Sequence, residues 1–135
     1  MKRTRLLNSE LSYEISRIGH TASITLCDAG LPIPSRIKRI DLAIEPGYPS
    51  FLRTLDALLS EMMIEEIVVA SEIHQHNTEI FRGLMDVIER HGMNPLVTEV
   101  SHEDFKRRSC ESEVFVRTGE CTPYANVILR SGVVF

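Results

Sequence analysis

The segment from residue 67 to residue 100, IVVASEIHQHNTEIFRGLMDVIERHGMNPLVTEV, decides the fold class. It begins with Ile67–Ala70, a short apolar run that is typical of a buried strand. Apolar side chains then keep helical spacing over Thr78–His91, with Asn77 in position to cap the helix. Leu96–Val100 predicts the next strand. Because a helix joins two strands, the segment favours a layered α/β domain whose sheet is largely parallel.

The rest of the chain continues this alternation of helices and strands. No internal repeat, low-complexity segment or linker divides it. We therefore expect one domain over residues 1–135, with a central, mostly parallel sheet flanked by helices. The further predicted helices run from the Asn8 cap to Gly19, over Pro49–Met63 and from Ser101 to Cys110; the further predicted strands are Ile24–Cys27, Ile40–Ile44, Val114–Arg117, Val127–Leu129 and Val133–Phe135.

The composition excludes several classes of protein. The 135 residues include 15 Lys and Arg against 19 Asp and Glu, a formal charge of −4, and 43% are hydrophobic. A chain this apolar can form a core, and a mildly acidic chain offers no general attraction for nucleic acid. No apolar run is long enough to span a bilayer, and polar residues interrupt the first 19 residues where a signal peptide would be apolar. We therefore expect a cytoplasmic protein.

Cysteines and paired histidines give no metal motif. Cys27, Cys110 and Cys121 are odd in number and include no Cys-x-x-Cys pair, so they form neither a disulfide framework nor a zinc module. His74 and His76 form a His-x-His pair, but this spacing fits no standard zinc motif, and we expect polar loop residues there. The spacing therefore predicts no metal site.

Several polar residues follow predicted strands, where ligands of α/β domains bind. Asp28, Glu72 and His102 each stand one or two residues beyond such a strand. Asp28 could orient a hydroxyl or an imidazole, or could simply cap a loop. His102 lies in the first turn of a predicted helix, where the helix dipole favours the neutral imidazole. It could bind a hydroxyl group there or be a solvent-exposed helix residue.

His20 and the loop 119–126 carry further polar groups. His20 stands between a helix end and a strand, where an imidazole can exchange protons near neutral pH or interact with the helix dipole. In the loop, Tyr124 and Asn126 could bind hydroxyl groups, although the segment could also be a plain turn. These residues alone do not identify a function.

Longer motifs carry more information than these single residues. Gly19-His20-Thr21 precedes the first strand, and CDAGLPIP occupies residues 27–34. RIDLA occupies residues 39–43, GECTPYANVIL residues 119–129, and GVVF residues 132–135. With these motifs in this order, the chain resembles the D-ribose pyranase family, in the superfamily that also contains the L-fucose mutarotases. The resemblance covers essentially the whole chain.

The resemblance implies a cofactor-free isomerase that interconverts the pyranose and furanose rings of ribose. Such an enzyme supports ribose catabolism, since ribokinase takes the furanose form. The resemblance also implies that His20 is the general acid and that Asp28, His102 and the segment Tyr124-Ala125-Asn126 contact the substrate. It further implies ring-like homo-oligomers, commonly decamers or octamers, with each site near a subunit boundary, and no membrane or nucleic-acid partner.

One position departs from the family pattern. The family usually has Asp after Gly-His-Thr, whereas this chain has Ala22. A carboxylate that could orient His20 or bind a hydroxyl is therefore missing from the motif. Three alternatives stay open: an isomerase for another sugar such as fucose, a non-catalytic sugar-binding partner of a transport system, and a metal-dependent enzyme.

Strand length bears on where the site can form. A straight strand from Ala22 to Asp28 spans roughly 20 Å. His20 and Asp28 could then not reach one sugar molecule within one subunit, unless the chain folds back around residues 20–23. Otherwise the site combines two subunits, which the family's oligomers would allow.

Overall fold

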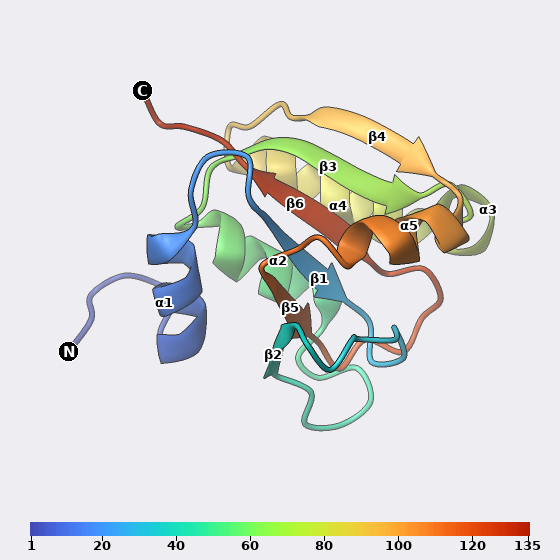
Figure 1. Ribbon diagram of the computed structural model, residues 1–135, viewed down its shortest axis with the longest axis horizontal. Coiled ribbons are helices and arrows are strands. Elements are labelled where there is room, and N and C mark those ends of the chain that lie inside the picture. Colours follow the sequence, from blue (N-terminus) through green and yellow to red (C-terminus); the bar gives the residue numbers. More distant parts are fainter.

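The computed structural model describes residues 1–135, and the helices pack around one central sheet (Figure 1). The helices are α1 (Ser9–Arg17), α2 (Phe51–Leu59), α3 (Ile73–His76), α4 (Thr78–Arg90) and α5 (His102–Ser109). The strands are β1 (Ser23–Cys27), β2 (Lys38–Asp41), β3 (Ile64–Ala70), β4 (Leu96–Val100), β5 (Val114–Arg117) and β6 (Val127–Ser131). The six strands are ordered β2-β5-β1-β6-β3-β4.

Strand β6 alone runs against the others. It pairs antiparallel with β1 and β3, whereas β1 with β5, β2 with β5, and β3 with β4 pair in parallel. The predicted α/β class with a mostly parallel sheet is thus confirmed. We call the edge where Cys27, Ala70 and Val100 end their strands the carboxyl edge, and β6 begins there. The opposite edge, where β1 and β3 begin and β6 ends at Ser131, is the amino edge.

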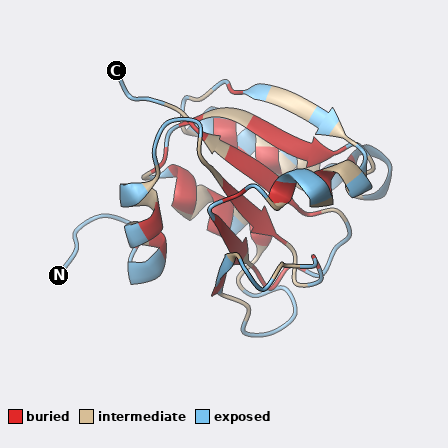
Figure 2. Ribbon diagram, in the orientation of Figure 1, coloured by how far each residue is buried: buried red, intermediate tan, exposed pale blue.

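Strand alternation divides the core between the two faces of the sheet. Ile24 and Leu26 of β1 belong to the larger apolar cluster, together with side chains of α1, α2 and α4. Cys27 and Phe115 belong to a smaller cluster with Phe105 of α5. Three helices therefore cover one face and α5 covers part of the other. Figure 2 shows that the inner strands are mostly buried, whereas the residues of the outer strand β4 are exposed or half-buried.

Local hydrogen bonds explain most of the helix starts. The side chains of Asn8, Ser50 and Ser101 each accept a hydrogen bond from the backbone three residues ahead, and so begin α1, α2 and α5. The predicted caps Asn8 and Ser101 are confirmed. The predicted side-chain cap at Asn77 is wrong: α4 begins there, but the Asn77 side chain makes no cap hydrogen bond.

Some element bounds differ from the prediction. Strand β3 starts at Ile64, three residues before the predicted start at Ile67. Helix α2 therefore ends at Leu59, before the predicted end at Met63, because the chain turns there toward β3. Strand β2 ends at Asp41, whose carboxylate accepts a hydrogen bond from the Ala43 N–H at 3.2 Å and so bends the chain. Residues 133–135 form an exposed tail rather than a strand. None of the helices is long and apolar enough to cross a membrane.

Candidate functional site

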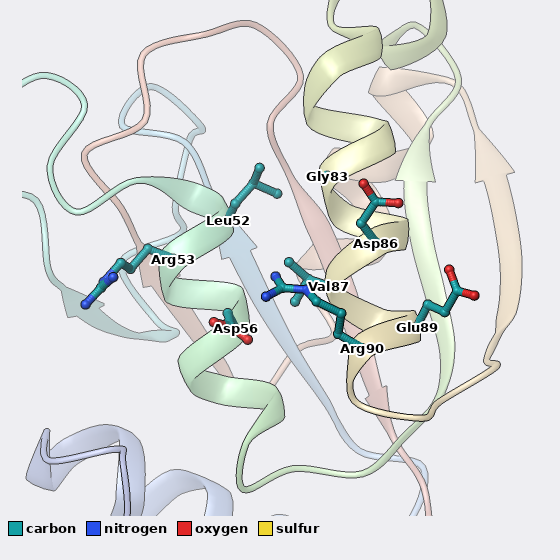
Figure 3. Close-up of a pocket in the computed structure, with 8 residues that line it drawn as sticks. All are labelled: Leu52, Arg53, Asp56, Gly83, Asp86, Val87, Glu89 and Arg90. Carbon is teal, nitrogen blue, oxygen red and sulfur yellow. The ribbon is translucent and has the colours of Figure 1, made fainter.

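A cleft of about 600 Å³ lies between α2 and α4 (Figure 3). Charged side chains dominate its lining, and Arg53 and Glu89 point away from the space between the helices. Asp56 already bonds Arg5 and His91. None of the predicted site residues lies there, so this cleft is not our candidate.

The second cleft lies at the carboxyl edge and has a volume of about 620 Å³. It brings together three residues that the sequence analysis singled out: Asp28 after β1, His102 at the start of α5, and Tyr124 before β6. They meet because parallel strands end at one edge and the antiparallel β6 begins there. The remaining lining residues are Ala29, Gly30, Leu31, Pro32, Glu120, Cys121, Thr122 and Pro123.

Asp28 is held by the side chain of Asn126. The Asn126 amide donates to Asp28 Oδ2 at 2.8 Å, and its Oδ1 accepts from the Asp28 N–H at 2.9 Å. The Gly30 N–H donates to Asp28 Oδ1 at 2.9 Å. Asn126 is 1% exposed, and within the chain its amide contacts Asp28. A contact of the Asn126 side chain with a hydroxyl group of a ligand stays a prediction. Ala125 is also fully buried.

His102 and Tyr124 form an aromatic wall of the cleft. Their rings meet edge to face with centroids 5.1 Å apart. The Nδ1 atom of His102 is buried and has no hydrogen-bond partner within the chain. Because buried polar atoms are nearly always paired, this atom is available to a bound polar group. Tyr124 has a φ of 58°, a left-handed conformation that is uncommon outside glycine.

Glu72 fixes the position of His102 through the main chain. Its Oε1 atom accepts a hydrogen bond from the backbone N–H of His102 at 3.0 Å. This hydrogen bond is the main reason that the pKa of Glu72 lies below its ordinary value. Glu72 was expected at this edge because it follows a predicted strand. Its part is to hold the first turn of α5.

Glu120 and Asn77, which were not expected to belong to the site, hold the loop 119–123. The buried carboxylate of Glu120 accepts from the N–H and the hydroxyl of Thr122, at 3.2 Å and 2.9 Å. The Asn77 amide donates to Thr122 Oγ1 and to the Pro123 carbonyl, both at 2.8 Å. The polar composition of the loop was the only indication in the sequence. Asn77 lies 45 residues from Thr122, and local spacing cannot reveal such a contact.

His20 lies at the amino edge, away from the cleft. It stands before β1, whereas Asp28 follows β1, and the chain does not fold back between them. The Nε2 atom of His20 lies 2.8 Å from Glu65 Oε2 at the start of β3. The structure therefore brings together Asp28, His102 and Tyr124 in one chain but leaves His20 at the other end of the sheet.

His74 and His76 lie on the short helix α3 rather than in the loop expected there, and Cys27 is buried. His74 contacts Glu99 at 2.8 Å, and the His76 ring lies against Tyr124 with centroids 5.3 Å apart. Burial raises the pKa of the Cys27 thiol to about 12, so this thiol is not a nucleophile. No group of three or more His, Cys, Asp or Glu side chains is arranged to hold a metal ion.

Comparisons with known proteins agree with this architecture. A D-ribose pyranase of Rhodopirellula baltica is 76% identical over 135 residues, and the match covers all of both chains. Bacillus subtilis RbsD complexed with D-ribose superposes with a TM-score of 0.92 at 39% identity, over 100% of both chains. The fucose mutarotase of Streptococcus pneumoniae in complex with L-fucose gives a TM-score of 0.82 at 28% identity, over 97% of this chain and 96% of that one.

The resemblance inferred from the motifs is thereby confirmed. The model of the RbsD / FucU transport protein family matches residues 1–134. The match covers all but the last of the 135 residues, and a relative at 76% identity over the full length supports it. The chain belongs to the RbsD / FucU transport protein family.

Proposed function

We propose that this protein is an isomerase that interconverts the pyranose and furanose forms of D-ribose. The observation that carries the proposal is the 76% identity, over all of both chains, to a D-ribose pyranase. The similarity in structure to RbsD complexed with D-ribose supports it. We expect the reaction to take place in the cytoplasm and to need no cofactor.

The cleft at the carboxyl edge suits a small polyol. Asp28 offers a carboxylate that is already oriented, and His102 Nδ1 offers a polar atom that lacks a partner. Tyr124 provides an apolar ring face against which a sugar can lie. In this proposal Asp28 and His102 bind hydroxyl groups, and Asn126 acts through Asp28.

His20 would act as the general acid. Its imidazolium gives a proton to the ring oxygen, the bond between that oxygen and the anomeric carbon breaks, and the anomeric hydroxyl loses its proton to water. The open aldehyde then closes through a different hydroxyl, whose proton goes to His20, while the aldehyde oxygen takes a proton back from water. General acid–base catalysis of this kind contributes about 10²–10⁴-fold, which suffices for a ring opening that already occurs spontaneously.

The site would combine two subunits. His20 and the cleft lie at opposite edges of one sheet, so a single chain cannot present both to one sugar. The exposed tail Val133–Phe135 follows β6, which ends at the amino edge, and offers apolar surface to a neighbouring subunit. We therefore propose a ring-like homo-oligomer, a decamer or an octamer, in which the amino edge of one subunit meets the cleft of the next.

Saturation-transfer NMR on D-ribose at equilibrium tests the proposed reaction. Exchange between pyranose and furanose anomeric signals should be faster with the protein than without it. His20→Ala should abolish this acceleration and leave circular dichroism unchanged, whereas Arg53→Ala in the α2–α4 cleft should keep it. Full activity in the His20→Ala protein would rule out this assignment.

Two other functions have a specific observation in their favour. The similarity to the L-fucose complex favours a mutarotase for another sugar, and a panel of sugars in the same NMR experiment separates it from ribose exchange. The family description favours a sugar-binding partner of a transport system. Tight binding of ribose without faster exchange would support that function instead.

A further inference from the structure

We propose that Glu65 is the positioning residue of His20 and supplies the carboxylate that Ala22 lacks. The proposal rests on the proposed function, in which His20 is the general acid. Glu65 would act through the imidazole and would not touch the sugar. Four features of the amino edge carry the argument.

The first feature is the contact itself. His20 Nε2 lies 2.8 Å from Glu65 Oε2, and the second oxygen, Oε1, lies 3.2 Å from Arg130 Nε in an ion pair. Arg130 also contacts Glu66 at 3.0 Å. One oxygen of Glu65 thus contacts His20, and the other faces the positive charge of Arg130 without receiving a hydrogen bond from its Nε. The Nε2 atom of His20 is occupied, and Nδ1 is the nitrogen left free to exchange a proton with substrate.

The second feature is a β-bulge at Glu65. The register between β3 and β6 shifts between Ile64 and Glu66. Neighbouring residues of a regular strand point to opposite faces, yet here both Glu65 and Glu66 reach Arg130. Bulges redirect a side chain and occur often beside active sites. The bulge explains how Glu65 can leave the regular alternation and reach His20.

The third feature is the turn that carries His20. Thr21 has a φ of 71°, a strained conformation for a β-branched residue. The Thr21 N–H donates to the Ser131 carbonyl at 3.1 Å, and the Ser131 N–H donates to the Ala22 carbonyl at 2.8 Å. The backbone next to His20 is thus tied to the end of β6, the strand that also carries Arg130. Both partners of the pair are anchored to one rigid element.

The fourth feature is the location of residue 22. Ala22 lines a separate, small cavity of about 110 Å³ together with Glu14, Arg17 and Glu113. A carboxylate at this position would lie among two other carboxylates and one guanidinium. In this chain the partner of His20 is instead contributed by β3, at Glu65.

The test compares Glu65→Ala and Glu65→Gln with a matched control. Glu99→Ala removes the carboxylate from the other exposed pair of this kind, His74 with Glu99 at 2.8 Å. In mildly alkaline solution, long-range ¹H–¹⁵N NMR should show the neutral His20 ring protonated at Nε2 in the unmodified protein. Glu65→Ala should give a mixture of tautomers, and Glu99→Ala should not change the His20 signals.

Kinetics supply the second measurement. Glu65→Ala should lower kcat for ring exchange by about 10–100-fold with little change in KM, by analogy with residues that orient metal-bound histidines. Glu65→Gln keeps an oxygen acceptor and should recover much of the loss. Size-exclusion chromatography checks that each variant assembles like the parent.

The outcomes separate this proposal from the proposed function. If His20→Ala abolishes exchange while Glu65→Ala keeps full kcat, the positioning role is overturned and the general acid stands. An unchanged His20 tautomer in Glu65→Ala overturns the positioning role whatever the activity. If His20→Ala keeps full exchange, the proposed role of His20 itself fails.

Discussion

Asn126 shows how a residue close to a site can matter through a neighbouring side chain. Its buried amide satisfies both the backbone N–H and the carboxylate of Asp28. The contact joins the end of β1 to the start of β6, two strands that pair antiparallel. A carboxylate held in this way is already oriented before a sugar arrives, so no ordering is required on binding.

We predict that Asn126→Ala lowers the free energy of unfolding by about 1–3 kcal/mol, because it leaves partners of a buried amide unpaired. Urea unfolding followed by circular dichroism measures the change. Asn94→Ala is the control, since Asn94 is exposed and its side chain makes no hydrogen bond. Equal stability of the two variants would show that Asp28 does not depend on Asn126.

Asp56 connects three segments of the chain. It lies on α2, bonds Arg5 of the N-terminal segment and contacts His91 after α4 at 2.7 Å. The pKa of Asp56 is about 2, against an ordinary value of 3.8. The hydrogen bond from Arg5 is the largest cause of this lowering, and the contact with His91 adds to it. The folded state therefore prefers the ionised carboxylate.

The sign of the pH dependence follows from this lowered pKa. The contribution of Asp56 is fully present above about pH 4 and is lost as the pH falls toward 2. Asp56→Asn should lower the free energy of unfolding by about 1–2 kcal/mol at neutral pH. This loss is smaller than the pKa shift alone would give, because Arg5 is partly exposed and solvent screens the ion pair. Urea unfolding across this pH range should show that the difference in stability between Asp56→Asn and the unmodified protein becomes smaller as the pH falls. Asp86→Asn, in the same cleft but without an ion pair, should show no such trend.

Local patterns predicted the elements whose signals are strong. The apolar runs of β1 and β3, the periodicity of α4 and the cap of α5 all lie within a few residues of one another in the sequence. The short helix α3 and the bulge at Glu65 have no such pattern, because tertiary contacts determine them. The end of β2 was misplaced because a side chain, Asp41, bends the backbone there.

The same distinction applies to the candidate site. Asp28 and His102 could be singled out because parallel strands deliver their ends to one edge. Glu65, Asn77 and Glu120 could not, since what they do depends on partners that topology brings close. His20 was singled out by a motif, and its distance from the cleft followed from the length of β1.

In the assembled oligomer, two variants that are each inactive should together recover ribose exchange. His20→Ala and Asp28→Asn damage opposite halves of the proposed shared site. When the two chains are co-expressed and assemble at random, about one quarter of the sites combine an intact His20 with an intact cleft. Ribose exchange should therefore return to about one quarter of the normal rate per subunit.

The matched control uses two changes in the same half. Asp28→Asn mixed with His102→Ala leaves every cleft with one defect, so their co-expression should restore nothing. If the first pair also restores nothing, although mass spectrometry shows mixed assemblies, the site does not combine two subunits.

The position of His20 and the cleft at opposite edges of one sheet has a consequence for assembly. When subunits join in an open row, the amino edge of each meeting the cleft of the next, one His20 at one end of the row lacks a cleft. The cleft at the other end lacks a His20. Only when the last subunit meets the first does every half find its counterpart. Under the proposed pairing, an incomplete circle carries one site fewer than its number of chains, and closing it gains that site without adding a residue.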